Sequence, residues 1–178
     1  MYDNDLIKLF LPVIDNGLID RGLNISATQS YQPVNQGIEL GESVYFFKVS
    51  DNRRGTTGVY EEWNILAGEK IRTEVQEYET TFQVNAYSIQ EPSNASQLTA
   101  SDIINVVLEI LQSEDTIITF RNSGVGILRI SDVRNPYFNN ERSDFEASAN
   151  FDFTLSYKRT REKVIPIVTE LETNILVV

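Results

Sequence analysis

The stretch from residue 144 to residue 157 alternates without a slip between polar and apolar side chains. The apolar members share one parity: Phe145, Ala147, Ala149, Phe151, Phe153, Leu155 and Tyr157. Successive side chains of a β-strand point to opposite faces of its sheet, so the pattern predicts a strand with one apolar and one polar face. Burial of a large apolar side chain contributes about 1.5–3 kcal/mol. This strand therefore predicts an antiparallel sheet that is covered on one side, and the rest of the chain must supply the cover.

The N-terminal segment 2–23 is the first candidate for that cover. Apolar residues follow one another at helical spacing after an acidic start, and Gly22 is placed to end the helix. Pro12 lies inside the segment. A proline removes a backbone donor and crowds the preceding turn, so the sequence predicts either a kink near Leu11 or a break with a restart at Val13.

A second helix is predicted after Thr99. Thr99 and Asp102 form a capping arrangement ahead of a long apolar run. That run is apolar over most of the helix circumference, which predicts burial on more than one side, by the sheet and by a neighbouring subunit. The residues that follow, around 117–120, fit a short helix or a strand.

Several more strands are predicted from β-branched and aromatic runs. They cover residues 25–31, 43–50, 59–66, 69–89 and 125–133. Residues 51–58 are polar and carry two glycines, so they are predicted to form a loop, as are residues 137–142. The alternation in 69–89 shifts phase by one, which predicts a bulge at 76–79, and Ala67 with Gly68 is a predicted turn between two paired strands.

These elements predict one α+β domain over residues 1–178, with a mainly antiparallel sheet and two or three helices packed on one face. Within it, residues 158–178 are predicted to be a C-terminal strand or an assembly arm. The end of the chain is apolar, and two placements stay open: it completes its own sheet or adds to the sheet of a neighbour.

Composition narrows the function. The formal charge is −11, which disfavours a protein that grips nucleic acid through clustered cations. Histidine and cysteine are both absent, so no thiol nucleophile and no usual structural zinc site is expected. Paired glutamates such as Glu61 with Glu62 could suggest acid–base catalysis, but their spacing on strands favours a solvated strand face. No run is long and apolar enough for a membrane span, and the acidic start is unlike a secretory signal; we expect assembly in the cytoplasm.

The candidate contact residues are cations that stand out from this acidic background. A local cluster is formed by Lys158, Arg159, Arg161 and Lys163, and a second pair by Arg53 and Arg54. Cations suit contacts with an acidic partner of the same kind, although ordinary solvated charge is the alternative for each of them. Reversal of Arg159 and Arg161 to Glu is predicted to weaken ring assembly and to leave the melting temperature of the monomer nearly unchanged.

The order of elements, with the segments ETTFQVNAYS and RSDFEASANFDFTLSYKRT, resembles the neck or tail terminator proteins of long-tailed phages. The resemblance covers roughly residues 6–157 and leaves out the 51–60 loop and the apolar C-terminus. It implies a structural virion protein without catalysis, cofactor or metal. It also implies a ring of six copies that caps the tail tube, ends tail polymerisation and offers the interface for the head.

The partners implied by this resemblance are further copies of the chain, the tail tube protein and a head-completion or connector protein, with the sheath protein as an additional one. DNA would pass through the ring without specific binding, and an acidic lumen would not retain it. Two alternatives stay open: a head-completion, connector or tail-tube protein of the same virion, and a metal-dependent enzyme that uses carboxylates alone.

Overall fold

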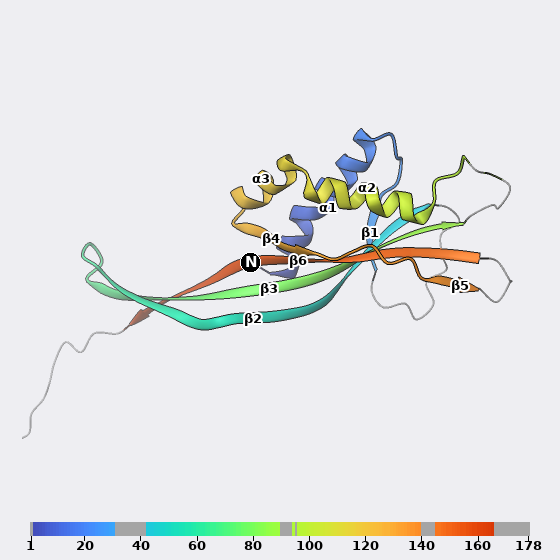
Figure 1. The fold of residues 1–178 in the computed structure, drawn as a ribbon. Helices are drawn as coiled ribbons and strands as arrows, with labels where there is room; N and C mark the ends of the chain where they lie inside the picture. Colours follow the sequence, from blue (N-terminus) through green and yellow to red (C-terminus); the bar gives the residue numbers. More distant parts are fainter. Residues whose placement is uncertain (1, 31–41, 90–93, 95, 140–144, 166–178) are drawn as a thin grey trace, which may run out of the picture.

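A computed structural model describes residues 2–30, 42–89, 94, 96–139 and 145–165. Three helices lie on one side of a six-stranded sheet with the order β1-β2-β3-β6-β4, and β5 also pairs with β6 (Figure 1). All strand pairs are antiparallel except β1 with β2, so the predicted α+β class is confirmed. The elements are α1 (Asp3–Asp20), β1 (Ala27–Gln29), β2 (Ser43–Asn64), β3 (Glu69–Ile89), α2 (Ala100–Gln112), α3 (Glu114–Asn122), β4 (Val125–Ile130), β5 (Tyr137–Asn139) and β6 (Phe145–Ile165).

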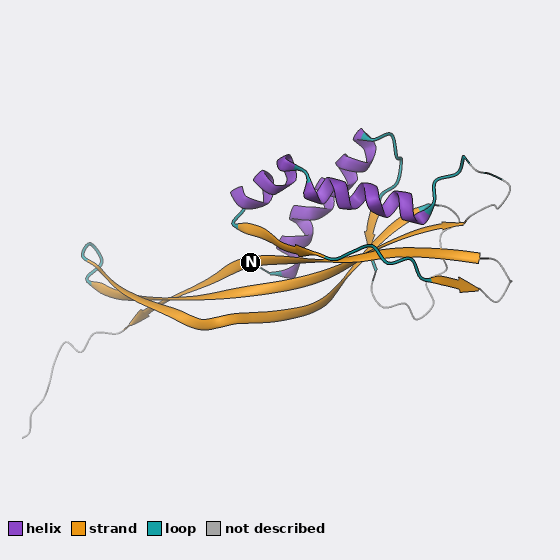
Figure 2. Cartoon of the chain, in the orientation of Figure 1, coloured by secondary structure: helices purple, strands orange, loops and turns teal. Residues whose placement is uncertain are grey.

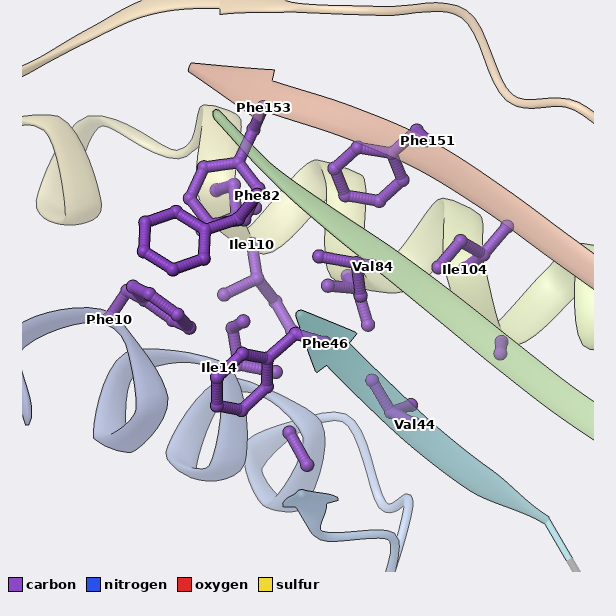
Figure 3. Packing of buried hydrophobic residues seen from close by; sticks show 14 of the residues in the cluster. Phe10, Ile14, Val44, Phe46, Phe82, Val84, Ile104, Ile110, Phe151 and Phe153 are labelled. Carbon is purple, nitrogen blue, oxygen red and sulfur yellow. The ribbon is translucent and has the colours of Figure 1, made fainter. Parts of the chain in front are cut away.

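The core lies between the helices and one face of β2, β3 and β6 (Figure 3). On β6 the predicted alternation is confirmed from Ala149 to Tyr157, because the odd-numbered side chains there are buried. Phe10 of α1 meets Phe46, Phe82 and Phe153 edge-on, with ring centroids 4.9, 5.0 and 5.3 Å away. Edge-to-face aromatic pairs add about 0.5–1.5 kcal/mol each beyond the area they bury. These four rings therefore fix α1 onto three strands at once.

Helix α1 is continuous through Pro12, so the predicted break is wrong. The proline side chain is exposed, while Leu6, Phe10, Ile14 and Leu18 form the buried side. Packing of that side against the sheet outweighs the loss of one backbone donor. The predicted end is confirmed, because Gly22 follows the helix with φ +78°, a conformation that glycine adopts at low cost.

The segment around residues 117–120, for which the sequence fits either a short helix or a strand, is a helix, α3. Its cap is Ser113, whose side chain accepts a hydrogen bond from the backbone N–H of Thr116. The cap of α2 is confirmed: the Thr99 hydroxyl accepts a hydrogen bond from the N–H of Asp102, and the Asp102 carboxylate accepts one from the N–H of Thr99. Thr116 then donates to the carbonyl of Ile110, which joins the two helices.

Three predictions about the strands are wrong in detail. Residues 51–58 belong to β2 and do not form a loop, and residues 137–139 form β5. Strand β3 pairs with β6 in one unbroken register, so its phase shift needs no bulge. The irregularities lie in the partner β2, between Lys48 and Ser50 and between Arg54 and Gly58. The predicted strand at 43–50, the edge strand near residue 27 and the strand at 125–130 are confirmed.

Candidate functional site

The strands β2, β3 and β6 continue beyond the helices as a three-stranded extension (Figures 1 and 2). We call this extension the arm, and it comprises residues 53–79 and 156–165. Of these residues only Tyr157, at the base, is buried. A sheet in a globular domain normally buries at least one face, whereas the described chain covers neither face of the arm. The part of the predicted C-terminal arm that is described, residues 158–165, completes this sheet within the same chain, and residues 166–178 lie outside the described residues.

Local chemistry explains how β2 and β3 form so long a hairpin. The side-chain oxygen of Asn64 accepts hydrogen bonds from the N–H groups of Leu66 and Ala67, at 3.2 and 3.3 Å. Gly68 follows with φ +64°, so the predicted turn is confirmed. At the irregularity in β2, the Gln76 amide donates to the carbonyl of Arg54 and accepts from the hydroxyl of Thr57. These bonds satisfy backbone and side-chain groups where the ladder between the strands is interrupted.

The two faces of the arm carry opposite charge. Strand alternation continues from the core, so the arm has a helix-side face, continuous with Phe82 and Phe153, and an open face. The charged residues of the helix-side face are the cations Arg53, Lys70, Arg72, Arg159, Arg161 and Lys163 and the carboxylates Glu61 and Glu74. Those of the open face are the carboxylates Glu62, Glu69, Glu77, Glu79 and Glu162 and the cations Arg54 and Lys158. The helix-side face thus has an excess of four positive charges and the open face an excess of three negative ones.

The structure brings all six predicted contact residues to this arm, but divides them between its faces. Arg53, Arg159, Arg161 and Lys163 lie on the helix-side face. Arg54 and Lys158 lie on the open face, where they contact Glu79 at 3.0 Å and Glu77 at 3.8 Å. Adjacent residues of a strand point to opposite faces, so two runs of cations in the sequence become one cationic face and two paired cations on the other side.

On the helix-side face, several charges are already paired within the arm. Lys70 contacts Glu61 at 2.6 Å, and Arg72 contacts Glu74 at 3.2 Å. Among the described residues, Arg161 and Lys163 have no carboxylate within ion-pair distance, and both are exposed. Lys163 lies directly opposite Arg72 in the β3–β6 register, and like charges in that position repel each other. The positive excess is therefore concentrated toward the end of β6.

At the base of the arm, Arg159 is surrounded by three tyrosines. Its guanidinium carbon lies 4.5 Å from the ring centroid of Tyr78, 5.6 Å from that of Tyr157 and 5.4 Å from that of Tyr2. It also donates a hydrogen bond of 3.2 Å to the Tyr157 hydroxyl. Burial disfavours the charge, but the tyrosine contacts and Asp3 outweigh burial and raise the pKa of Arg159. Because Tyr2 precedes α1, these contacts tie the helical layer to the arm.

A second set of contacts at the base centres on Lys48. Its ammonium group forms ion pairs with Asp3 of α1, at 2.7 Å, and with Asp51 of β2. Partial burial of Lys48 opposes its charge, but the hydrogen bonds to the two carboxylates raise its pKa. Asp51 also accepts a hydrogen bond of 2.6 Å from the hydroxyl of the buried Thr80. Burial would raise the pKa of Asp51, yet the bonds from Lys48 and Thr80 lower it overall. No sequence pattern predicts this junction, because Lys48 and Asp3 are 45 positions apart and neither forms a local motif.

The tip of the arm is apolar. Trp63 is 55% exposed, Ile65 84% and Leu66 100%, which makes the turn between β2 and β3 the most exposed apolar segment of the described chain. Apolar side chains clustered at the end of a projecting element typically mark a contact site.

Two further observations bear on the function classes. No group of three or more histidine, cysteine or carboxylate side chains in the described residues is placed to hold a metal ion. No helix formed by these residues is long and apolar enough to cross a membrane.

Fold and site define a class of protein: an α+β body whose central sheet projects past its helices as a bare arm with oppositely charged faces. Within this class, the family model described as E217 gateway protein gp29 matches residues 5–167. The match spans nearly the whole chain, and the chain belongs to this family of phage head–tail gateway proteins. No curated protein shows significant sequence similarity to it.

This membership confirms the predicted resemblance at the level of a bacteriophage structural family and a component of the virion. The narrower assignment to tail terminators stays a prediction, as do the hexameric ring and the contact role of the six cations.

Proposed function

We propose that this chain joins head and tail of a phage as a structural protein, and that it does so as a hexameric ring seated on the tail tube. In this proposal the ring ends tube polymerisation and offers the interface for a head-completion or connector protein. It carries no catalytic activity and no cofactor. Family membership supports the head–tail position, and the arm is the observation that supports a role in assembly.

The arm supports this role because its surface is unlike that of an isolated domain. Three strands extend past the helical layer with both faces exposed and with an apolar tip. Long sheet segments with exposed edges and apolar ends promote association, and soluble monomers normally cover or shorten them. In a ring, neighbouring copies and the tube protein would supply that cover.

The distribution of charge supports passage of DNA without binding. The arm holds eight of the chain's 15 lysine and arginine residues but only seven of its 26 acidic residues, so the negative excess of the sequence lies outside the arm. An acidic wall repels phosphate over about one Debye length, roughly 8 Å at physiological salt. We expect a ring whose lumen is lined by the body to let DNA slide.

The first test is the mass of the purified chain by light scattering over a concentration series, with electron microscopy of any large species. A hexamer or a ring with a central hole is the expected result. The second test adds the protein to growing tail tubes. Addition should stop elongation and place a ring at one end of each tube. Tubes that grow at an unchanged rate, with no density at their ends, would contradict the capping role.

Membership of a gateway family also favours a second candidate, a head-completion or connector protein of the same virion. The two differ in what they bind when purified: a terminator binds tubes, and a connector protein binds the portal side of the neck. A tail-tube protein is less favoured, because tube subunits are nearly all-β and the described residues of this chain form three helices on its sheet.

A further inference from the structure

We infer that the arms of neighbouring copies pack face to face, with the cationic helix-side face of one arm against the acidic open face of the next. This inference rests on the proposed ring and names the surface through which its copies meet. The partner is a second copy of this chain, and both contact surfaces lie on the same three strands.

The two faces of the arm are complementary in charge. The helix-side face has an excess of four positive charges and the open face an excess of three negative ones. Two surfaces on opposite sides of one sheet cannot meet within a single copy. They meet in a head-to-tail contact between copies, which closes into a ring when the rotation between neighbours divides a full turn. A two-fold dimer would instead place like faces together, and their charges would repel.

A like-charge pair on the helix-side face is only half compensated by the described residues. Arg72 and Lys163 are direct neighbours across β3 and β6, and like charges so placed are destabilising. Arg72 has Glu74 as a partner, whereas Lys163 has no carboxylate within reach among the described residues. On the open face, Glu62 and Glu162 are exposed and likewise form no ion pair with described residues. Contact between the helix-side face of one copy and the open face of the next would bring these cations and carboxylates together.

The area of one arm face sets how strongly two copies can bind through it. The part of β6 in the arm has ten residues, so with a rise of about 3.3 Å per residue the arm is roughly 33 Å long, and three strands spaced about 4.8 Å give a width near 14 Å. One face then covers about 450 Å², roughly half of the area per partner in a stable standard interface. A single contact of this size is weak. Closure of a ring, where every copy makes two such contacts, is needed to hold it.

The test uses two charge-reversed variants of the full chain. The first carries Arg161→Glu and Lys163→Glu on the helix-side face. The second carries Glu62→Lys, Glu69→Lys and Glu162→Lys on the open face. We count the charges on the outer part of the arm, residues 59–74 and 161–165. There the first variant changes the helix-side face from an excess of two positive charges to two negative ones, and the second changes the open face from three negative charges to three positive ones.

Each variant alone should associate at least tenfold more weakly than the wild type, because both of its faces then carry the same sign. A 1:1 mixture should recover association, since each altered face finds its complement on the other variant. The recovered ring should alternate between the two variants, and affinity capture through a tag on one of them should recover equal amounts of both. Association of the wild type should also weaken between 0.1 and 1 M salt, where the Debye length falls from about 10 to 3 Å.

A matched control separates docking from folding. Lys163→Glu replaces the repelling pair with an attractive one, so this single variant should melt at or above the temperature of the wild type while it associates less. A merely destabilised arm would give the opposite correlation. Lys70→Glu on the same face serves as a comparison, because it breaks the pair with Glu61 and should lower stability.

Several outcomes would overturn the inference. Variants that assemble like the wild type, or a mixture that recovers nothing up to millimolar concentration, exclude arm-to-arm contact. Binding of a 30-base-pair duplex that only the first variant loses, without recovery on mixing, assigns the cationic face to DNA instead. Rings that persist in both variants leave the proposed ring intact and reject its arm contacts, whereas mixed association without a closed ring supports the contacts and rejects the proposed ring.

Discussion

At the residue scale, Gly17 is required by the contact between α1 and α2. A Cβ atom at this position would lie 2.7–2.8 Å from three atoms of the Ile110 side chain, which is itself buried. Overpacking of this kind costs about 1–3 kcal/mol, more than the roughly 0.5–1 kcal/mol that alanine gains over glycine in a helix. We expect Gly17→Ala to lower the free energy of unfolding, measured by urea denaturation.

The control for this prediction is a double-mutant cycle. Ile110→Ala removes all three contacted atoms, so Gly17→Ala should cost little in that background. The sum of the two single effects should therefore exceed the effect of the double variant. Strict additivity would show that the helices shift apart and that the contact is not close in solution.

The N-terminal cap of α2 should contribute to stability in a pH-dependent way. The Asp102 carboxylate accepts hydrogen bonds from the Thr99 N–H at 3.0 Å and from the Thr99 hydroxyl at 2.7 Å, and these bonds lower its pKa below the ordinary 3.8. A carboxyl with a lowered pKa stabilises the fold fully above its unfolded value and loses that contribution as pH falls through the folded one. We expect Asp102→Asn to cost about 0.3–1 kcal/mol at pH 7, the scale of a helix N-terminal charge, and the gap to close below pH 3.8.

Urea unfolding of both proteins at pH 7, 5 and 3 measures this gap. The value should be the same at pH 7 and 5 and smaller at pH 3. A gap that persists unchanged at pH 3 would mean that the shape of the amide and not the lost charge causes the effect.

At the scale of elements, the base of the arm depends on Arg159. Its contacts with three tyrosines join α1, β3 and β6. We expect Arg159→Met to lower the free energy of unfolding by about 0.5–2 kcal/mol and to speed hydrogen exchange of the arm amides. Arg161→Met is the matched control, since it lies two residues further on the same face and no aromatic ring contacts it among the described residues. Its effect should stay within about 0.5 kcal/mol.

Equal effects of these two variants would show that the tyrosines do not anchor the arm. The same contacts change an expectation drawn from the sequence, that reversal of Arg159 and Arg161 together leaves monomer stability untouched. Reversal of Arg159 removes an anchor, so a stability loss and an assembly loss would be mixed. Reversal of Arg161 with Lys163 leaves that anchor in place. It creates a like-charge pair with Glu74 and removes the one with Arg72, so its two effects on stability oppose each other.

The elements that the sequence predicted correctly are those whose signals are local. Strict alternation identifies β6, and the caps at Thr99 and Gly22 mark helix ends from a few neighbouring residues. Residues 51–58 were missed because this part of β2 is buried on neither face and carries no apolar side chain, so it looks like a polar loop. The candidate cations were predicted from their clustering along an otherwise acidic sequence. Their division between two faces depends on the register of β2 and β6 against β3, which no local pattern encodes.

At the scale of the whole molecule, the boundary between the helix-covered body and the arm is also a boundary between acidic and nearly neutral parts of the described chain. The helical layer covers the part of the sheet that holds the core, and the described residues outside the arm carry 13 carboxylates against six cations. The arm has nearly balanced charge, separated by face and not by position along the strands. A body that repels its own copies and an arm that attracts them would keep the chain monomeric at low concentration and orient it on assembly.

The apolar tip of the arm should matter for assembly and not for stability. Ile65 and Leu66 are 84% and 100% exposed, so they contribute almost nothing to the core of their own chain. Ile65→Ser with Leu66→Ser should leave the free energy of unfolding within about 0.5 kcal/mol of the wild type. If the tip contacts the tube or a neighbouring copy, the same variant should cap tail tubes at least tenfold less efficiently, because about 1.5–3 kcal/mol is at stake for each large apolar side chain that becomes buried.

Ile19→Ser is the control for the tip, since this residue is 61% exposed on α1 and lies far from the arm in the sequence; it removes one exposed apolar side chain where the tip variant removes two. It should cap tubes like the wild type. Equal losses in both variants would point to general solubility or folding. Full capping by the tip variant would place the assembly contacts on the faces of the arm and leave its end free, since charge complementarity between faces requires nothing from residues 65 and 66.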